Sequence, residues 1–293
     1  MMSLLVKLTR ALSRVPLEVL YRLSDLLYPV VYWVVRYRRR IVRRNLVHSF
    51  PEKSLREIKS MERRFYRYFC DIMMETVRQL SISEDEMRRR MVFSNEQLMM
   101  DQLRQGKSVM LMTGHYCNWE WGLSVSYYLP DGCKVYPVYQ RLNNPAFEEL
   151  MLEIRGHLGG QCIEKDELVR TMFKLRKEHK HGIYGMISDQ SPLKKFIRYR
   201  MEFLHQDTPV FLGTEQLARK YDYPVFYLDV RRVKRGQYAC EVVPVSLEPA
   251  ATAEYEITNR FMSMLERSIR RQPELWLWSH NRWKHSNSGD SMS

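Results

Sequence analysis

Short apolar runs alternate with longer amphipathic segments through the greater part of the chain. The apolar runs fit buried strands, because each is bounded by glycine, proline or polar residues. The expected strands are residues 108–113, 134–139, 183–187, 224–230 and 239–245. The segments between them fit helices over residues 118–128, 145–157, 166–179, 210–221 and 254–271. This alternation predicts an α/β fold with a mixed, mostly parallel sheet flanked by helices.

An amphipathic helix is expected near the N-terminus. Apolar residues recur at three- and four-residue steps from Leu12 to Val34, and Pro29 is expected to kink the helix. The charge-free run from Leu26 to Val35 is shorter than the roughly 20 residues that a membrane span needs. We therefore expect a helix that lies in the membrane interface, with packing on the protein's own core as the alternative. Charged residues interrupt the apolar region, so no cleavable signal is expected.

A basic segment follows, with six arginines between Arg36 and Arg44. Beside an apolar helix, this composition predicts contact with anionic lipid on the cytoplasmic face of a membrane. The formal net charge of +13 also favours an anionic partner. Nucleic acid is not the expected partner, because no zinc finger, RNP-type pattern or helix-turn-helix signal accompanies the arginines. A merely solvated basic face remains the alternative.

The chain is expected to divide into three parts. Residues 1–45 form the membrane-associated helix and basic segment, and residues 46–285 form the main domain. The first part of that domain, over residues 52–105, fits two or three helices, the first opened by Pro51. Residues 286–293 are Ser-rich and are expected to be a disordered tail.

The strand over 108–113 leads directly into a candidate catalytic motif. Gly114 allows a tight turn, and His115 and Glu120 then lie at the carboxyl end of a strand, where open α/β sheets place their ligands. If His115 lies on the turn and Glu120 early in the next helix, the carboxylate can fix one ring nitrogen and leave the other as a general base. No nucleophile-elbow pattern is nearby, so this base would act directly on a substrate hydroxyl. A histidine with a purely structural hydrogen bond is the alternative.

Other polar residues that follow an expected strand, or that end the helix after one as Arg155 does, are candidates for binding substrate. They are Arg141, Arg155, Asp189, Gln190, Lys194 and Lys195. Lys194 and Lys195, together with Arg198 and Arg200 after them, fit phosphate groups, with ordinary surface charge as the alternative. The five cysteines are scattered and fit neither a zinc site nor a disulfide framework, and no glycine-rich dinucleotide loop is present. We therefore expect no metal and no cofactor.

The order and spacing of these motifs resemble the bacterial lipid A late acyltransferases, a branch of the glycerolipid acyltransferase superfamily. The matching stretches are Arg43 to Leu46, Phe50 to Glu52, His115 with Glu120, Tyr139 to Pro145, Ser188 to Gln190, the Pro-Val-Phe-x-Gly run from Pro209, and Trp278 to Lys284. The resemblance implies transfer of a fatty-acyl chain from acyl-carrier protein or acyl-CoA to a hydroxyl of a lipid A precursor. It also implies that His115 is the general base held by Glu120, and that Arg155 and Asp189 are needed for activity.

A thioester donor is already activated, so this chemistry needs no covalent enzyme intermediate. The tetrahedral oxyanion needs a hydrogen-bond donor, and Arg155 and a backbone N–H after Gly114 are both candidates. The sequence alone does not choose between them.

Two departures from the family pattern leave the acceptor open. The chain has Tyr139-Gln140-Arg141 where many members have Tyr-Arg-Pro, and Ser188-Asp189-Gln190-Ser191 where many have Pro-Asp-x-Asp. Both lie in the family's acceptor-facing region. Acylation of a lysophospholipid or an amino lipid is therefore the nearest alternative reaction. A non-catalytic basic protein that binds a membrane surface or nucleic acid is the alternative from another functional class.

Overall fold

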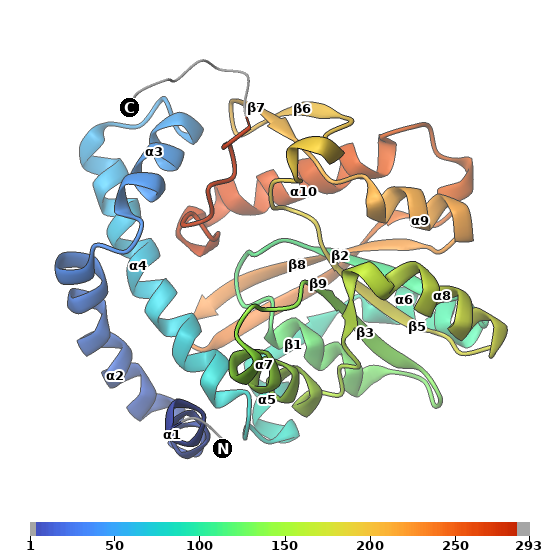
Figure 1. The fold of residues 1–293 in the computed structure, drawn as a ribbon, viewed down its shortest axis with the longest axis horizontal. Helices are drawn as coiled ribbons and strands as arrows, with labels where there is room; N and C mark the ends of the chain where they lie inside the picture. Colours follow the sequence, from blue (N-terminus) through green and yellow to red (C-terminus); the bar gives the residue numbers. More distant parts are fainter. Residues whose placement is uncertain (1–3, 286–293) are drawn as a thin grey trace.

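A mixed, mostly parallel sheet of seven strands forms the centre of the molecule (Figure 1). The structure is a computed structural model and describes residues 4–285; the expected tail over 286–293 lies outside these residues. The strands of the sheet are β1 (Met91–Ser94), β2 (Val109–Thr113), β3 (Lys134–Tyr139), β4 (Ile163–Glu164), β5 (Gly182–Ile187), β8 (Val225–Lys234) and β9 (Gln237–Ser246). Their order is β1-β9-β8-β2-β5-β3-β4, and only β8 and β9 pair antiparallel. The predicted sheet is confirmed.

All five expected strands are present, and two short strands extend the sheet at its edges. β1 and β4 have only four and two residues, too few to show a period in the sequence. A separate antiparallel pair, β6 (Arg200–Phe203) with β7 (Gln206–Pro209), follows the strand β5 in the chain.

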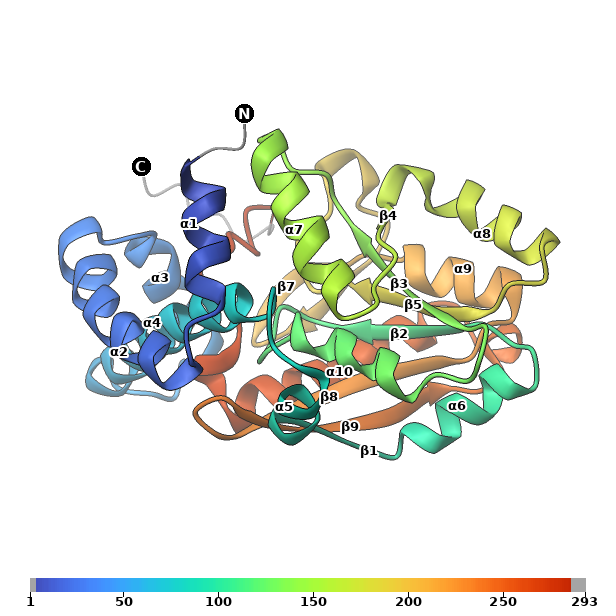
Figure 2. The same cartoon turned by 90° about the horizontal axis from the view of Figure 1, so that it is seen from below.

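Helices cover both faces of the sheet and one of its ends. The α-helices are α1 (Leu4–Ser13), α2 (Leu17–Pro29), α3 (Arg39–Ser49), α4 (Leu55–Arg78), α5 (Glu84–Arg90), α6 (Glu96–Arg104), α7 (Pro145–His157), α8 (Leu168–Lys177), α9 (Gly213–Tyr221) and α10 (Glu256–Arg271). α10 packs on one face of β8 and β9, and α5 and α6 lie on the opposite face (Figures 1 and 2). The 3-10 helices are η2 (Trp121–Tyr128), η3 (Lys165–Glu167), η4 (Lys194–Phe196), η5 (Pro249–Ala251) and η6 (Pro273–Leu275).

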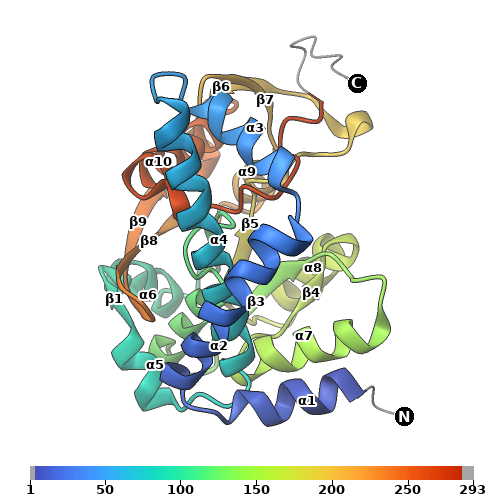
Figure 3. The same cartoon turned by 90° about the vertical axis from the view of Figure 1, so that its left-hand side faces the viewer.

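α4 runs across the end of the sheet at which β8 finishes, and the N-terminal helices pack on its outer side (Figure 3). It begins at the N-cap Ser54 and not at Pro51, because Ser54 and Glu57 form a reciprocal capping box. The polar segment expected to hold two or three helices contains α4, α5 and α6, with β1 between the last two.

The expected N-terminal helix is broken into pieces. α1 ends at Ser13, α2 begins after Pro16, and a π-helix, η1 (Val30–Val35), continues from Pro29. Proline removes a backbone donor, which explains both discontinuities. Between residues 4 and 285, no helix combines the length and the apolar character that crossing a bilayer requires.

α2 has two apolar faces. Leu17, Leu20 and Tyr21 are buried, and the contacts of α2 are mainly with α4. The stripe that the sequence pattern singles out lies largely on the other side, where Leu26 is 70% and Val34 of η1 75% exposed. Val19, Leu23 and Val30 are exposed on the same side. The apolar periodicity of this stripe is therefore not explained by packing within the described chain.

Candidate active site

The parallel pairing of β2 with β5 brings two candidate residues together. Thr113 at the end of β2 is paired with Ile187 at the end of β5, so His115 and Asp189 each lie two residues beyond a paired position. His115 Nδ1 lies 2.7 Å from Asp189 Oδ1, and the backbone N–H of His115 donates to Oδ2 at 2.9 Å. The site therefore forms at the carboxyl end of the parallel strands, as expected.

Asp189 is a buried carboxylate with three donors. Besides the two from His115, Trp276 Nε1 donates to Oδ2 at 2.8 Å. Burial alone would raise the pKa of Asp189, but the charge of His115 and these hydrogen bonds outweigh it and lower the pKa to about 2. An ionised Asp189 makes Nδ1 of His115 the protonated nitrogen, which leaves Nε2 as an acceptor.

The loop after β2 is shaped by tertiary contacts, which corrects two expectations. Gly114 does not have a positive φ. A Cβ there would lie 3.0 Å from Leu265 Cδ1 and 3.2 Å from Asp189 Oδ2, so glycine permits a close approach of these groups. The left-handed residue is Cys117, with φ 54°. The following helix begins at Trp121 and is a 3-10 helix, where a helix from residue 118 was expected.

Residues near the C-terminus hold this loop in place. The backbone N–H of Cys117 donates to the carbonyl of Leu275 at 2.9 Å, and the N–H of Leu277 donates to the carbonyl of His115 at 3.0 Å. Asn118 is held from the other side, because its Nδ2 donates to the buried Glu75 of α4 at 2.6 Å. His115 is thus fixed by contacts from three distant parts of the chain.

Glu120 does not accept a hydrogen bond from His115, contrary to the expected pairing. Its carboxylate instead binds Arg155 of α7 in a bidentate ion pair, with Nε at 3.0 Å and Nη2 at 2.7 Å. The nearest link between the two candidates runs through Trp119. The ring of Trp119 packs edge-to-face on His115 with centroids 5.2 Å apart, and its Nε1 donates to Glu120 Oε1 at 3.3 Å.

Gln190 also reaches the histidine. Its Nε2 lies 3.3 Å from Nδ1 and 3.2 Å from Nε2 of His115. One residue further on, the backbone N–H of Ser191 donates to His280 Nε2 at 3.3 Å. Burial lowers the pKa of His280 to about 4, so this second imidazole is neutral and accepts the bond.

The remaining predicted binding residues lie on the surface. Arg141 is exposed in the segment before α7, and Lys194 and Lys195 are exposed on η4. No hydrogen bond or ion pair joins these three described residues to His115, Asp189, Glu120 or Arg155. The structure therefore brings together His115, Asp189 and Gln190, with Glu120 and Arg155 as a neighbouring pair, and leaves the other cations outside.

Sequence reasoning missed Trp276, Trp119 and Asn118 as residues that shape the site. Trp119 stands beside Glu120 in the sequence, and Trp276 is separated from Asp189 by 87 positions. No spacing signal connects these residues. Within residues 4–285, no group of three or more His, Cys, Asp or Glu side chains is placed to hold a metal ion.

Comparison of the sequence with known proteins identifies the family of the chain. No curated protein matches the chain. The family model described as bacterial lipid A biosynthesis acyltransferase matches residues 1–285, which is nearly the whole chain and includes every residue of the site. The chain therefore belongs to the bacterial lipid A biosynthesis acyltransferase family and is an acyl-transferring enzyme.

Proposed function

We propose that this enzyme is a membrane-bound O-acyltransferase of the cytoplasmic face of the inner membrane. It moves a fatty-acyl chain from the thioester of acyl-carrier protein or acyl-CoA to a hydroxyl of a lipid A precursor. The observation that carries the proposal is the 2.7 Å contact between His115 Nδ1 and the buried Asp189, in a chain of this family. It supplies a histidine whose other nitrogen, Nε2, acts as the base once the acceptor hydroxyl takes the place of Gln190 Nε2, which lies 3.2 Å away.

In the proposed reaction, Nε2 of His115 takes the proton of the acceptor hydroxyl as its oxygen attacks the thioester carbonyl. Asp189 stabilises the imidazolium that forms. The tetrahedral intermediate then expels the thiolate, which takes the proton from Nε2. The products are an ester and a free thiol, and His115 returns to its starting state.

Arg155 is the proposed donor to the oxyanion. The backbone N–H groups of His115 and Cys117 already donate to Asp189 and Leu275, so they are engaged in the loop itself. Arg155 gives Nε and Nη2 to Glu120, and its Nη1 makes no bond to that carboxylate. In this proposal Glu120 acts by holding Arg155 in position, and Asp189 takes the role first expected for Glu120.

The exposed apolar side of α2 and η1 supports a membrane location. Leu26, Trp33 and Val34 are more than half exposed there. Arg36 and Arg40, also exposed, follow directly in the chain. Burying apolar surface in the membrane contributes about 25 cal/mol per Å². Each arginine at an anionic surface adds an attraction of about 1 kcal/mol, and the two effects would act together.

The exposed cations Arg141, Lys194 and Lys195 are proposed to meet anionic groups of the donor or the acceptor. Lys194→Gln with Lys195→Gln should therefore raise KM and leave kcat unchanged.

The test is acyl transfer by the purified protein, followed by mass spectrometry of the lipid product. A lipid A precursor is offered beside a lysophospholipid and an amino lipid, each with acyl-carrier-protein and CoA thioesters. Acylation of the lipid A precursor that is lost in His115→Ala, with an unchanged circular dichroism spectrum, supports the proposal. Acylation of only another acceptor would reassign the substrate, and undiminished turnover in His115→Ala would remove the mechanism.

A further inference from the structure

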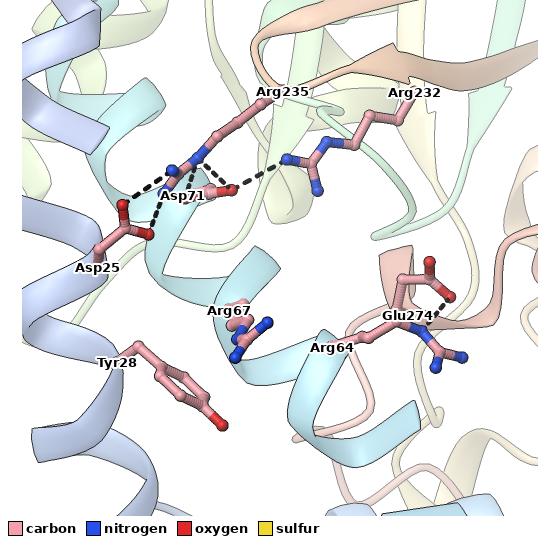
Figure 4. A pocket seen from close by; sticks show the side chains of 8 residues that line it. All are labelled: Asp25, Tyr28, Arg64, Arg67, Asp71, Arg232, Arg235 and Glu274. Carbon is pink, nitrogen blue, oxygen red and sulfur yellow. Dashed lines mark hydrogen bonds and ion pairs between the residues drawn. The ribbon is translucent and has the colours of Figure 1, made fainter. Parts of the chain in front are cut away.

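A charged cavity of about 490 Å³ lies between α2, α4, the β8–β9 hairpin and η6 (Figure 4). Its lining residues are Asp25, Tyr28, Arg64, Arg67, Asp71, Arg232, Arg235 and Glu274, and none of them belongs to the active site described above. Binding cavities for small molecules have volumes of about 300–1,000 Å³. No aliphatic side chain is among the lining residues, so the chemistry of the cavity suits a charged group.

The carboxylates of the cavity are already paired. Asp71 accepts from Arg232 at 3.0 Å and from Arg235, and Asp25 accepts from Arg235 at 2.7 Å. Arg64 lies 3.6 Å from Glu274. Four arginines face three carboxylates, which leaves one positive charge in excess.

The arginines differ in how many of their donors the protein uses. Arg235 donates hydrogen bonds from Nε and both terminal nitrogens to Asp25 and Asp71. Its role is therefore to join α2 and α4 to the hairpin. Arg232 gives only Nη2 to Asp71. Arg67 packs 5.2 Å from the ring centroid of Tyr28 and makes no direct ion pair with a described carboxylate, although its charge helps to lower the pKa of Asp25. Figure 4 shows Arg67 between Tyr28 and Arg64, with no interaction drawn from its guanidinium.

Guanidinium groups with unused donors on several sides of one cavity fit a phosphate. Arginine binds phosphate through paired N–H donors, and hydrogen bonds between charged groups are among the stronger ones. The excess charge of the cavity matches an anion. A cavity of this size also has room for more than the phosphate itself.

The position of the cavity points to a phosphate carried by a lipid. Asp25 and Tyr28 lie on α2 itself, and Leu26, which is 70% exposed, directly follows Asp25. Adjacent residues of a helix are about 100° apart around its axis, so a lipid with its chains beside Leu26 can extend its headgroup past Asp25 to the cavity.

We propose that this cavity binds the phosphate of an anionic lipid headgroup, at a site separate from the catalytic one. The inference rests on the proposed membrane location for its biological setting. The binding itself is tested in solution and without acyl transfer.

The experiment measures binding of dihexanoyl phosphatidylglycerol, below its micelle concentration, to the full-length protein by isothermal titration calorimetry at physiological salt. Arg64→Gln with Arg67→Gln removes two charges from the cavity. Lys59→Gln with Arg63→Gln removes two charges from the same helix outside it and is the matched control. We expect saturable binding that weakens at least about 10-fold in the cavity variant and less than about 2-fold in the control. Thermal unfolding checks that both variants fold.

Three results would overturn the inference: no saturable binding by the unaltered protein, equal losses in the two double variants, or inorganic phosphate that binds as tightly as the lipid. The last result would mean a site for the free anion. If the cavity double variant fails to fold, Arg67→Gln alone takes its place, because Arg67 makes no direct ion pair with a described carboxylate. Acyl transfer is measured separately in detergent. Loss of lipid binding with normal turnover supports this site, whereas absent turnover with normal binding counts only against the proposed function.

Discussion

Asp189 Oδ1 lies 2.7 Å from His115 Nδ1, and the two residues follow the paired strand ends Ile187 and Thr113. The same carboxylate also accepts the backbone N–H of His115 and the indole N–H of Trp276. It therefore fixes the position of the loop and the tautomer of the imidazole together. Glu120, the closer carboxylate in sequence, pairs instead with Arg155.

Replacing Asp189 by Asn should reduce kcat by at least about 10²-fold with little change in KM. The amide can still accept from His115 N and Trp276, but its NH₂ group would face Nδ1 and favour the unproductive tautomer. Steady-state kinetics with a thioester donor measure this, and Asp166→Asn, an exposed change of the same chemistry, is the control. A normal kcat in Asp189→Asn would show that this contact is only structural.

The pair of Glu120 and Arg155 gives a second prediction. Removing one partner, in Glu120→Gln or Arg155→Met, leaves an uncompensated charge in a largely buried place and should destabilise the fold by about 3–5 kcal/mol. The double variant should recover part of that stability, because both charges are gone. Urea unfolding measures the stability of all three variants.

Turnover of the double variant separates the two possible roles of this pair. We expect it to stay low, because the proposed oxyanion donor is missing. Restored stability together with restored turnover would mean that Glu120 and Arg155 only support the fold.

Four of the arginines between α2 and α4 form two pairs with different expected effects. Arg39 Nε donates to the fully buried Glu62 at 3.1 Å, and Arg43 Nε donates to it at 2.7 Å. Arg39→Gln with Arg43→Gln should therefore lower the melting temperature, since a buried carboxylate loses its partners.

Arg36→Gln with Arg40→Gln removes the same amount of positive charge, but from exposed positions. It should leave the melting temperature unchanged and weaken flotation with anionic liposomes. Equal flotation of that variant and the unaltered protein would contradict a lipid contact by these two arginines.

Glu75 gives a prediction about pH. Burial raises its pKa from 4.5 to about 7, although Tyr21, Tyr238 and Asn118 donate to its carboxylate. A folded pKa above the unfolded one means that folding favours the protonated group. This stabilisation is complete below about pH 4.5 and is lost as the pH rises through about 7.

The free energy of unfolding should therefore fall more steeply between about pH 5 and about pH 8 in the unaltered protein than in Glu75→Gln. The unaltered protein should lose about 1–3 kcal/mol more than the variant over this range. Urea unfolding at several pH values measures both slopes. Comparing the two proteins at each pH cancels the titration of their shared histidines. Parallel slopes would mean that Glu75 does not titrate in this range.

The sequence by itself determined the five longer strands of the sheet, most of the helices and the residues at the ends of β2 and β5. Bounded apolar runs and amphipathic periods carry that information locally, and the residues after a parallel strand belong at one known edge of a sheet. His115, Asp189 and Gln190 could be singled out in this way, and Arg155 stood out at the far end of the helix α7. Proline likewise indicated the break after α2, at Pro29.

Only the tertiary structure decided which carboxylate meets which base. Spacing along the chain made Glu120 the expected partner of His115, but strand register placed Asp189 there, 74 residues away. It also decided that Gly114 is needed for a close approach and that the left-handed turn falls on Cys117. Trp276 reaches Asp189 because the segment after α10 returns to pair with the loop after β2. Which side of α2 faces outward was likewise set by its packing on α4. These outcomes depend on contacts between segments far apart in the chain, and a local pattern contains no information about such pairings.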